Sequence, residues 1–360
     1  MGPSLTGIWN KNMTTKTGIW NKNMTTKSIA VAVTVALIMT TQSDAGDRLD
    51  YQSTWLGNDY VYGPEIYHRG GHTPHNVADI HVLPDGTVFT NVPWDERGAN
   101  VTAYRNGRWV TDVRTGNSGG GRTITANEEY LFFGGRKYRK ADKGIDRVDL
   151  AAPADRSRNV HVDCGEVHGL AANDERVFAS VPDEQVIKVF DIDLQPITTW
   201  PIEDADEMCL DAAGTLWVIH PEARRIARYD PQGNGLPQRI DLPEGEVPTD
   251  VAIDNHGRLM VTDAGPAHQV RFYTNIDKQP KFDGTFGIEG GVFAGEKGRF
   301  GPRRLYRPMG VGMDRLGNLY VANRAGMSGS FMLQAYSPSE QLLWERRCLV
   351  WIDCPAIHPD

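Results

Sequence analysis

One pattern of apolar and polar positions recurs along the chain. Two apolar residues flank a small one, an Asp follows, a turn with Gly comes next, and an apolar run ends the unit. The pattern is clearest in MCLDAAGTLWVIH from Met208, VAIDNHGRLMVTD from Val251 and VGMDRLGNLYVAN from Val311. Short apolar runs broken by Gly, Asp and Asn are typical of β-strands joined by tight turns. Each unit therefore predicts an inner strand, a turn in which the Asp bonds to backbone amides, and a second strand.

Six copies of this unit follow one another at a regular spacing of about 40 to 60 residues, which is the period of propeller blades. The aligned turn positions are Gly86, Glu129, Glu175, Gly214, Gly257 and Gly317. Two further strands fit behind each copy, such as HQVRFY and KFDGTFG behind the copy at Val251. The sequence therefore predicts an all-β fold, a six-bladed β-propeller of four-stranded antiparallel blades.

The predicted propeller occupies residues 46–347, and residues 348–360 form a C-terminal tail that resembles a truncated extension. Two segments compete for the outer strand that closes the ring, namely STWLG near Trp55 and QLLWERR near Trp344. The sequence leaves this choice open.

Residues 1–45 are typical of an export signal and not of a folded domain. Lys27 precedes the apolar stretch from Ile29 to Met39, which is too short to span a bilayer and suits the core of a signal peptide. Small residues around Ala45 suit cleavage, and the segment TGIWNKNMTTK occurs twice in tandem before Ser28. We expect a secreted or periplasmic protein with no membrane span after cleavage; an uncleaved membrane anchor is the alternative.

Charge and cysteine content narrow the classes of function. The formal net charge of −8 argues against a nucleic-acid partner, because phosphate binding relies on clustered Lys and Arg. The chain has four cysteines and no CxxC motif, so neither a thiolate zinc site nor a redox pair is indicated. An even number of cysteines permits disulfides after export, and Cys348 with Cys354 is the one pair close in sequence. The alternative is that all four are reduced and buried.

Ionisable residues recur at one position of the repeat, two residues before the small position of the inner strand. The six residues at this position are Asp79, Arg122, His168, Glu207, Asp250 and Gly310. Loops that lead into the inner strands of a propeller lie on one face, around the central channel. We therefore expect all six to point toward the channel mouth.

Asp79, Glu207 and Asp250 would repel one another if packed closely, unless a cation or Arg122 compensates their charge. Oxygen ligands with at most one imidazole favour calcium, magnesium or manganese over zinc, although His168 keeps zinc open. We therefore expect Asp79, Glu207, Asp250 and His168 to bind a divalent metal. The alternative is that these charges line a water-filled channel, or close the ring through ion pairs such as Arg122 with Glu207.

Histidines supply the candidate general bases, because imidazole titrates near neutrality. His75, from the cluster HRGGHTPHN, and His168 are the candidates, and Arg122 is the further candidate catalytic residue. Loops expected on the same face also contribute His220, His268 and Arg324.

Two stretches resemble a known repeat family. The segment from Gly284 to Arg324 looks like an NHL repeat, and VPTDVAIDNHGRLMVTDAG from Val247 resembles another. NHL-type six-bladed propellers are similar to gluconolactonase and the senescence-marker lactonases, whose channel metal is bound by Glu, Asn and Asp. They also resemble the peptidyl-hydroxyglycine amidating lyase, whose channel metal is held by histidines. The residue mix at the equivalent positions here reproduces neither set.

Two hypotheses of function follow. The first is a secreted, metal-dependent hydrolase or lyase that acts on a small lactone or sugar derivative in the channel, with His168 or His75 as base. The second is a non-catalytic propeller that binds a ligand, an extracellular protein or a glycan.

Overall fold

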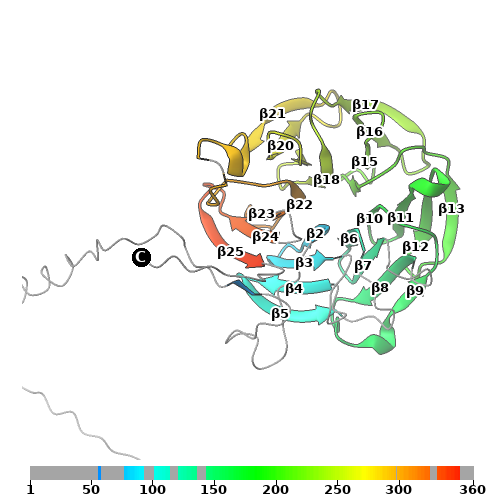
Figure 1. Ribbon diagram of the computed structural model, residues 1–360. Helices are drawn as coiled ribbons and strands as arrows, with labels where there is room; N and C mark the ends of the chain where they lie inside the picture. The colour runs from blue at the N-terminus through cyan, green and yellow to red at the C-terminus, as the bar shows by residue number, and fades with distance from the viewer. Residues whose placement is uncertain are drawn as a thin grey trace, which may run out of the picture. The chain divides into compact units, whose positions relative to one another are not determined.

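The computed structural model describes residues 56–57, 77–92, 101–113, 121–135, 143–296, 298–324 and 331–348. Six antiparallel sheets stand in a ring, and the innermost strand of each sheet faces a central channel (Figure 1). The prediction of a six-bladed β-propeller with four-stranded blades is confirmed.

Every blade is a run of four strands consecutive in the chain, ordered from the channel outward. Blade 1 holds β2 Asp79–Val82, β3 Thr87–Asn91, β4 Val101–Arg105 and β5 Arg108–Val113. Blade 2 holds β6 Thr123–Ala126, β7 Tyr130–Gly135, β8 Gly144–Asp149 and β9 Val160–Val162. Blade 3 holds β10 Gly169–Ala172, β11 Arg176–Val181, β12 Val186–Asp191 and β13 Pro196–Trp200.

The second half of the ring repeats this order. Blade 4 holds β14 Met208–Leu210, β15 Leu216–His220, β16 Arg225–Tyr229 and β17 Gly235–Asp241. Blade 5 holds β18 Pro248–Ile253, β19 Leu259–Asp263, β20 Gln269–Thr274 and β21 Lys281–Phe286. Blade 6 holds β22 Pro308–Met313, β23 Leu319–Arg324, β24 Phe331–Tyr336 and β25 Leu342–Cys348. The described helices are short 3-10 turns, η1 Arg156–Arg158, η2 Pro182–Glu184 and η3 Gly291–Phe293.

The turn between the inner and second strands comes in two lengths. In blade 4 the Asp211 amide donates to the Thr215 carbonyl at 3.0 Å, and the Asp211 carboxylate accepts two backbone amides of the turn. The predicted role of this Asp is confirmed here and at Asp254 and Asp314. In blade 2 an Asn takes its place, and the Asn127 amide donates to the Tyr130 carbonyl only three residues later. Blade 3 has the same shorter turn, in which the Asn173 amide donates to the Arg176 carbonyl. Repeats aligned on their turns are therefore displaced by one residue along the inner strands of blades 2 and 3.

The last blade closes the ring without borrowing a strand from the N-terminal side. The segment QLLWERR forms β25, the outer antiparallel strand of blade 6, and β1 Leu56–Gly57 adds to it in parallel from outside. The junction between blades 6 and 1 is held by packing, with Tyr104 and Tyr320 buried in one apolar cluster. The Arg346 guanidinium also donates to the Gly107 carbonyl at 3.0 Å. The two segments that competed for the closing strand therefore lie side by side, with β25 inside and β1 outside it.

An apolar cluster lies between each pair of neighbouring blades. Fully buried aromatic side chains anchor several of them, for example Phe132 between blades 2 and 3 and Trp217 between blades 4 and 5. Since burial of apolar area is the main favourable term in folding, these six clusters hold the ring together.

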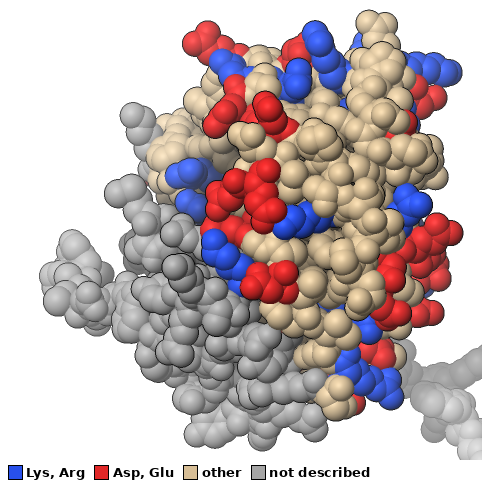
Figure 2. All heavy atoms as spheres, turned by 90° about the vertical axis from the view of Figure 1, so that its right-hand side faces the viewer, with Lys and Arg blue, Asp and Glu red and all other residues tan. Residues whose placement is uncertain are grey.

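The outer surface mixes both signs of charge. On the side of the ring that carries β13, Asp and Glu side chains gather in groups with Lys and Arg between them (Figure 2).

Several predictions from the sequence fall outside the described residues. These are the signal peptide, most of the tail from 348 to 360, and His75. In the described part of the chain no helix is long and apolar enough to cross a membrane. Cys164 and Cys209 are free thiols, and burial raises the pKa of both.

Neighbouring blades approach so closely at β10 and β14 that only glycine fits at residue 169. A Cβ on Gly169 would lie 2.2 Å from the Asp206 carbonyl oxygen and 2.7 Å from the Glu207 Cα. Gly169→Ala is expected to lower the free energy of unfolding by about 1–3 kcal/mol, because both atoms belong to the backbone. Urea denaturation measures this change.

Gly235→Ala is the matched control, because its Cβ would meet nothing closer than Tyr229 Cε1 at 3.8 Å. A change within about 0.5 kcal/mol is expected there. Equal losses in the two variants would contradict the close approach of blades 3 and 4.

Candidate functional site

Two rings of side chains surround the channel, one above the other. Their registers are fixed by hydrogen bonds between blades. The Asp79 carboxylate accepts the Ile124 amide of the next blade at 2.8 Å, and the Asp250 carboxylate accepts the Val311 amide of its next blade at 2.7 Å. Ile124 and Val311 are therefore equivalent. The inner ring, one residue before this position, consists of Asp79, Thr123, Gly169, Glu207, Asp250 and Gly310.

The residues that precede the inner ring form a second ring at the channel mouth. Its members are Ala78, Arg122, His168, Asp206, Thr249 and Met309, and all six line one cavity. The prediction that Arg122 and His168 share a register with the three carboxylates is thus wrong by one residue. The cause is the shorter turn in blades 2 and 3, on which the repeats had been aligned.

Asp79 and Asp250 in the inner ring join neighbouring blades. Each uses one carboxylate oxygen to accept the next residue's amide, Ile80 or Val251, at 2.7 Å. The other oxygen accepts the amide of the next blade, as described above. Buried carboxylates that accept two amides stabilise the contact between blades, which is a structural role.

Glu207 lies in the same ring and reaches a different partner. Its Oε2 accepts the hydroxyl of Thr123 in blade 2 at 3.0 Å, so it links blade 4 to blade 2. Burial raises the pKa of Glu207, and the nearby charges of Asp79 and Asp250 raise it further. Burial also raises the pKa of Asp79, with Asp250 adding to the effect, and raises that of Asp250 to about 7. Asp79, Glu207 and Asp250 line one cavity, and the charge of Asp250 contributes to the raised pKa of the other two.

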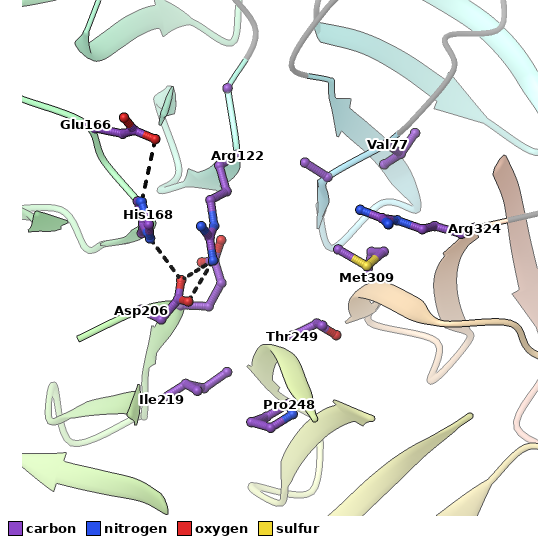
Figure 3. A pocket seen from close by; sticks show the side chains of 13 residues that line it. Val77, Arg122, Glu166, His168, Asp206, Ile219, Pro248, Thr249, Met309 and Arg324 are labelled. Atoms are coloured by element: carbon purple, nitrogen blue, oxygen red, sulfur yellow. Dashed lines mark hydrogen bonds and ion pairs between the residues drawn. The ribbon is translucent and has the colours of Figure 1, made fainter. Parts of the chain in front are cut away.

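The mouth cavity has a volume of about 570 Å³ and lies directly above Glu207. Its walls carry ionisable groups on the side of blades 2 to 4 and an arginine on the side of blade 6 (Figure 3). Apolar side chains complete the wall, namely Val77, Ile219, Pro248 and Met309. Apolar surface with a few convergent polar groups is typical of a small-molecule site.

A network of alternating charges forms the first wall. The Arg122 Nη2 donates to both carboxylate oxygens of Asp206, at 2.9 and 2.6 Å. The His168 Nδ1 lies 3.8 Å from Asp206 Oδ1, and its Nε2 lies 3.7 Å from Glu166 Oε1. Figure 3 shows His168 between these two acids, with Arg122 beside it on the side of the cavity and its guanidinium at Asp206. The predicted pairing of Arg122 with Glu207 is replaced by a pairing with its neighbour Asp206.

His168 is poised as a neutral base. Its side chain is 20% exposed, and burial lowers the pKa of the imidazole, with the positive charge of Arg122 lowering it further. Asp206 and Glu166 oppose this shift. An imidazole that is neutral at physiological pH and held beside carboxylates can accept a proton from a bound molecule.

Arg324, at the end of β23, projects into the cavity from the opposite side (Figure 3). Its Nε is buried without a hydrogen-bond partner among the described residues. Burial lowers the pKa of Arg324, and Arg307 lowers it further by repulsion. The guanidinium stays charged, since arginine is not deprotonated in proteins.

The four predicted metal ligands divide between the two rings. Both oxygens of Asp79 and of Asp250 accept backbone amides, and His168 contacts Glu166 and Asp206 in the outer ring. Across the described residues, no group of three or more His, Cys, Asp or Glu side chains is arranged to hold a metal ion. The donor arrangement therefore does not fit a preformed metal site, and binding of a divalent ion stays a prediction.

Two other predicted same-face histidines have structural partners. The His220 ring bonds to the Glu203 carbonyl and the Tyr229 hydroxyl, each at 3.0 Å. His268 packs against the rings of Phe293 and Tyr306. The residues that sequence reasoning missed are Asp206 and Glu166, which the corrected register would have found beside Glu207 and His168.

The fold and site define a six-bladed β-propeller with an ionisable cavity over its channel. Residues 160–265 match the SMP-30/Gluconolactonase/LRE-like region family. The match runs from β9 of blade 2 through blades 3 and 4 to the end of β19 in blade 5. The resemblance to the lactonase superfamily is confirmed over this part, while the likeness of Gly284–Arg324 to an NHL repeat stays a prediction. No curated protein sequence matches the chain.

Solved structures with the same fold are distant in sequence. The virginiamycin B lyase of Staphylococcus aureus superposes with a TM-score of 0.51 at 10% identity, over 76% of this chain and 84% of that one. A streptogramin B lyase gives 0.51 at 11% identity, over 78% and 85% of the two chains. A protein of unknown function from Bacteroides thetaiotaomicron gives 0.53 at 11% identity, over 70% and 67%. At these identities the likeness concerns the fold alone.

Proposed function

We propose that the protein is an enzyme of the hydrolase or lyase type that acts on a small oxygenated molecule in the mouth cavity. The observation that carries this proposal is the placement of His168 between Glu166 and Asp206, opposite Arg324 across one cavity. Lactones, esters and sugar derivatives are the leading substrate class.

His168 acts as the general base in this reaction. In hydrolysis it takes a proton from water as the water oxygen bonds to the substrate carbonyl carbon. The carbon–oxygen bond then breaks, and the proton passes to the leaving oxygen. In elimination the imidazole of His168 takes a proton from a substrate carbon. The electrons of that C–H bond form a double bond to the neighbouring carbon, whose leaving group departs with the electron pair of its own bond. Asp206 and Glu166 stabilise the imidazolium that forms in either case.

Arg122 is a positioning residue for this base. Its two bonds to Asp206, at 2.9 and 2.6 Å, hold that carboxylate beside the imidazole. Because Arg122 also keeps part of its side chain open to the cavity, it can donate to a substrate oxygen on which negative charge develops. The match of residues 160–265 to the lactonase family and the fold shared with lyases are compatible with this chemistry.

A non-catalytic, ligand-binding propeller is the second candidate. It is favoured by the amide bonds of Asp79 and Asp250, which give two of the predicted site residues a purely structural role. In this case the cavity would bind a small molecule or a group of an extracellular protein or glycan without converting it. Under both candidate functions, we propose that the chain is exported to the periplasm or secreted.

Turnover of a panel of lactones and esters by the purified protein tests the proposal. Hydrolysis or elimination that persists after chelation is expected, since the described side chains supply the base. No turnover of any member, together with saturable binding of one, would support the second candidate instead.

Metal analysis of the same preparations addresses the predicted ion. One equivalent of calcium, magnesium or manganese retained by the wild type and lost in Asp250→Ala, with turnover lost on chelation, would support the metal site. It would contradict the expectation that turnover persists after chelation.

A further inference from the structure

The two walls of the mouth cavity differ in how their charges are balanced. On the wall of blades 2 to 4, Arg122 is neutralised by Asp206. On the wall of blade 6, the positive charge of Arg307 repels Arg324 and lowers its pKa. No described carboxylate forms an ion pair with Arg324. A partly buried guanidinium without a counter-charge is costly, so this wall attracts an anion.

The geometry of Arg324 suits a bound group and not a bond within the protein. Its Nε is buried and unpartnered among the described residues, while the side chain lines the cavity. The planar guanidinium offers parallel N–H donors that match the two oxygens of a carboxylate. In Figure 3 the side chain of Arg122 lies between His168 and Arg324. Beyond it the lining holds Thr249 and the apolar side chains of Val77, Met309, Ile219 and Pro248.

We propose that Arg324 forms a carboxylate-binding subsite, so that the ligand of the mouth cavity is a small organic acid with an apolar or hydroxylated body. The ligand's carboxylate bonds to the guanidinium, and its body crosses the cavity toward His168. The placement of the ligand body rests on the proposed function, because it puts the reacting ester or lactone bond beside His168. The carboxylate subsite at Arg324 does not depend on that function.

A carboxylate fits this cavity better than a phosphate monoester does. Asp206 lines the same space but is paired with Arg122, whereas the charge of Glu166, which also lines it, repels an anion that extends toward it. A group that carries about −2 at neutral pH suffers this repulsion twice as strongly as a carboxylate, and one guanidinium neutralises only half of it.

Calorimetric binding of matched pairs of small molecules tests the subsite. The pairs are gluconate with sorbitol, glucuronate with glucose, and phenylacetate with phenylacetamide, and inorganic phosphate is measured beside them. At least one acid is expected to bind about tenfold or more tightly than its neutral partner. Equal binding within all three pairs, no binding by any acid, or tighter binding of phosphate would overturn the proposal.

Variants assign the effect to one side chain. Arg324→Gln is expected to weaken binding of the preferred acid by about ten- to hundredfold, and Arg324→Lys to recover part of the loss, since it keeps the charge without the fork. Arg108→Gln, on the exposed outer strand of blade 1, is the matched control and should change nothing. An unchanged affinity in Arg324→Gln would also overturn the subsite.

The measurement separates this proposal from the proposed function. Binding is measured in His168→Gln as well as in the wild type, so turnover is not required. If acids bind through Arg324 and no lactone or ester is converted, the proposed function fails and the subsite stands. If esters are converted with no preference for acids, the subsite fails alone.

Discussion

Under the proposed function, His168→Gln is expected to lower kcat/KM for the substrate by about 10²- to 10⁴-fold, the usual contribution of a general base. Glutamine keeps the size and polarity of the side chain but cannot accept a proton near neutral pH. Because substrate binding relies on the other walls of the cavity, the loss should fall on kcat more than on KM.

The pH profile of the wild type follows from the direction of the His168 pKa shift. Burial and Arg122 hold the pKa of this imidazole below the ordinary value of 6.5. The base is therefore neutral and active above that pH, and kcat/KM should fall only as pH drops below 6.5. In His168→Gln the remaining kcat/KM should no longer fall as the pH drops below 6.5.

His256→Gln is the matched control, because His256 is exposed and lines a separate cavity between blades 5 and 6. It should leave kcat/KM unchanged. A loss shared by both variants, or full activity in His168→Gln, would refute the assigned base.

Glu207→Gln is expected to raise the free energy of unfolding by about 1–3 kcal/mol at about pH 8. Burial of the wild-type carboxyl raises its pKa, the charges of Asp79 and Asp250 raise it further, and Arg122 opposes them with a smaller effect. Glutamine is uncharged at every pH, so folding no longer requires a buried carboxyl to be either protonated or held as a charge beside Asp79 and Asp250. Its amide oxygen can still accept the Thr123 hydroxyl that Glu207 Oε2 accepts at 3.0 Å.

The gain should depend on pH in one direction. With a folded pKa well above the ordinary value of 4.5, Glu207 keeps its proton in the folded chain when the unfolded chain has lost it. Its contribution to stability is present at low pH and is lost as pH rises through the folded pKa. Because glutamine imitates the protonated form, the two proteins should be equally stable near about pH 4 and differ most at about pH 8.

Urea denaturation across this pH range measures the difference, with Glu222→Gln as control for an exposed glutamate. The control should stay within about 0.5 kcal/mol of the wild type at each pH. A Glu207→Gln protein that is less stable than the wild type at high pH would contradict the account. It would indicate that a bound cation already neutralises the carboxyls and that their charge is required.

The fold could be predicted from the sequence because one short pattern specifies each blade. The apolar residues around Ala252 and Gly312 and the Asp turns behind them repeat with little change. Ring closure could not be predicted, because Leu56–Gly57 and β25 both have strand patterns and only the tertiary structure decides their order.

The candidate site could be predicted only in part. The acidic inner ring followed from Asp79, Glu207 and Asp250, whose blades share the longer turn. The predicted register was wrong for His168, because the Asn turn of its blade is one residue shorter than the Asp turns used to align the repeats. His168 therefore lies at the channel mouth and not in the inner ring. The ion pair between Arg122 and Asp206 joins residues 84 positions apart, so no local pattern marks it.

A crystal structure of the protein with its preferred acid bound tests the central claim most directly. The account predicts density for the ligand in the mouth cavity, with its carboxylate on the Arg324 guanidinium and its body directed at His168. Ligand density in the cavity between blades 5 and 6, with the space between Arg324 and His168 filled by water alone, would contradict it.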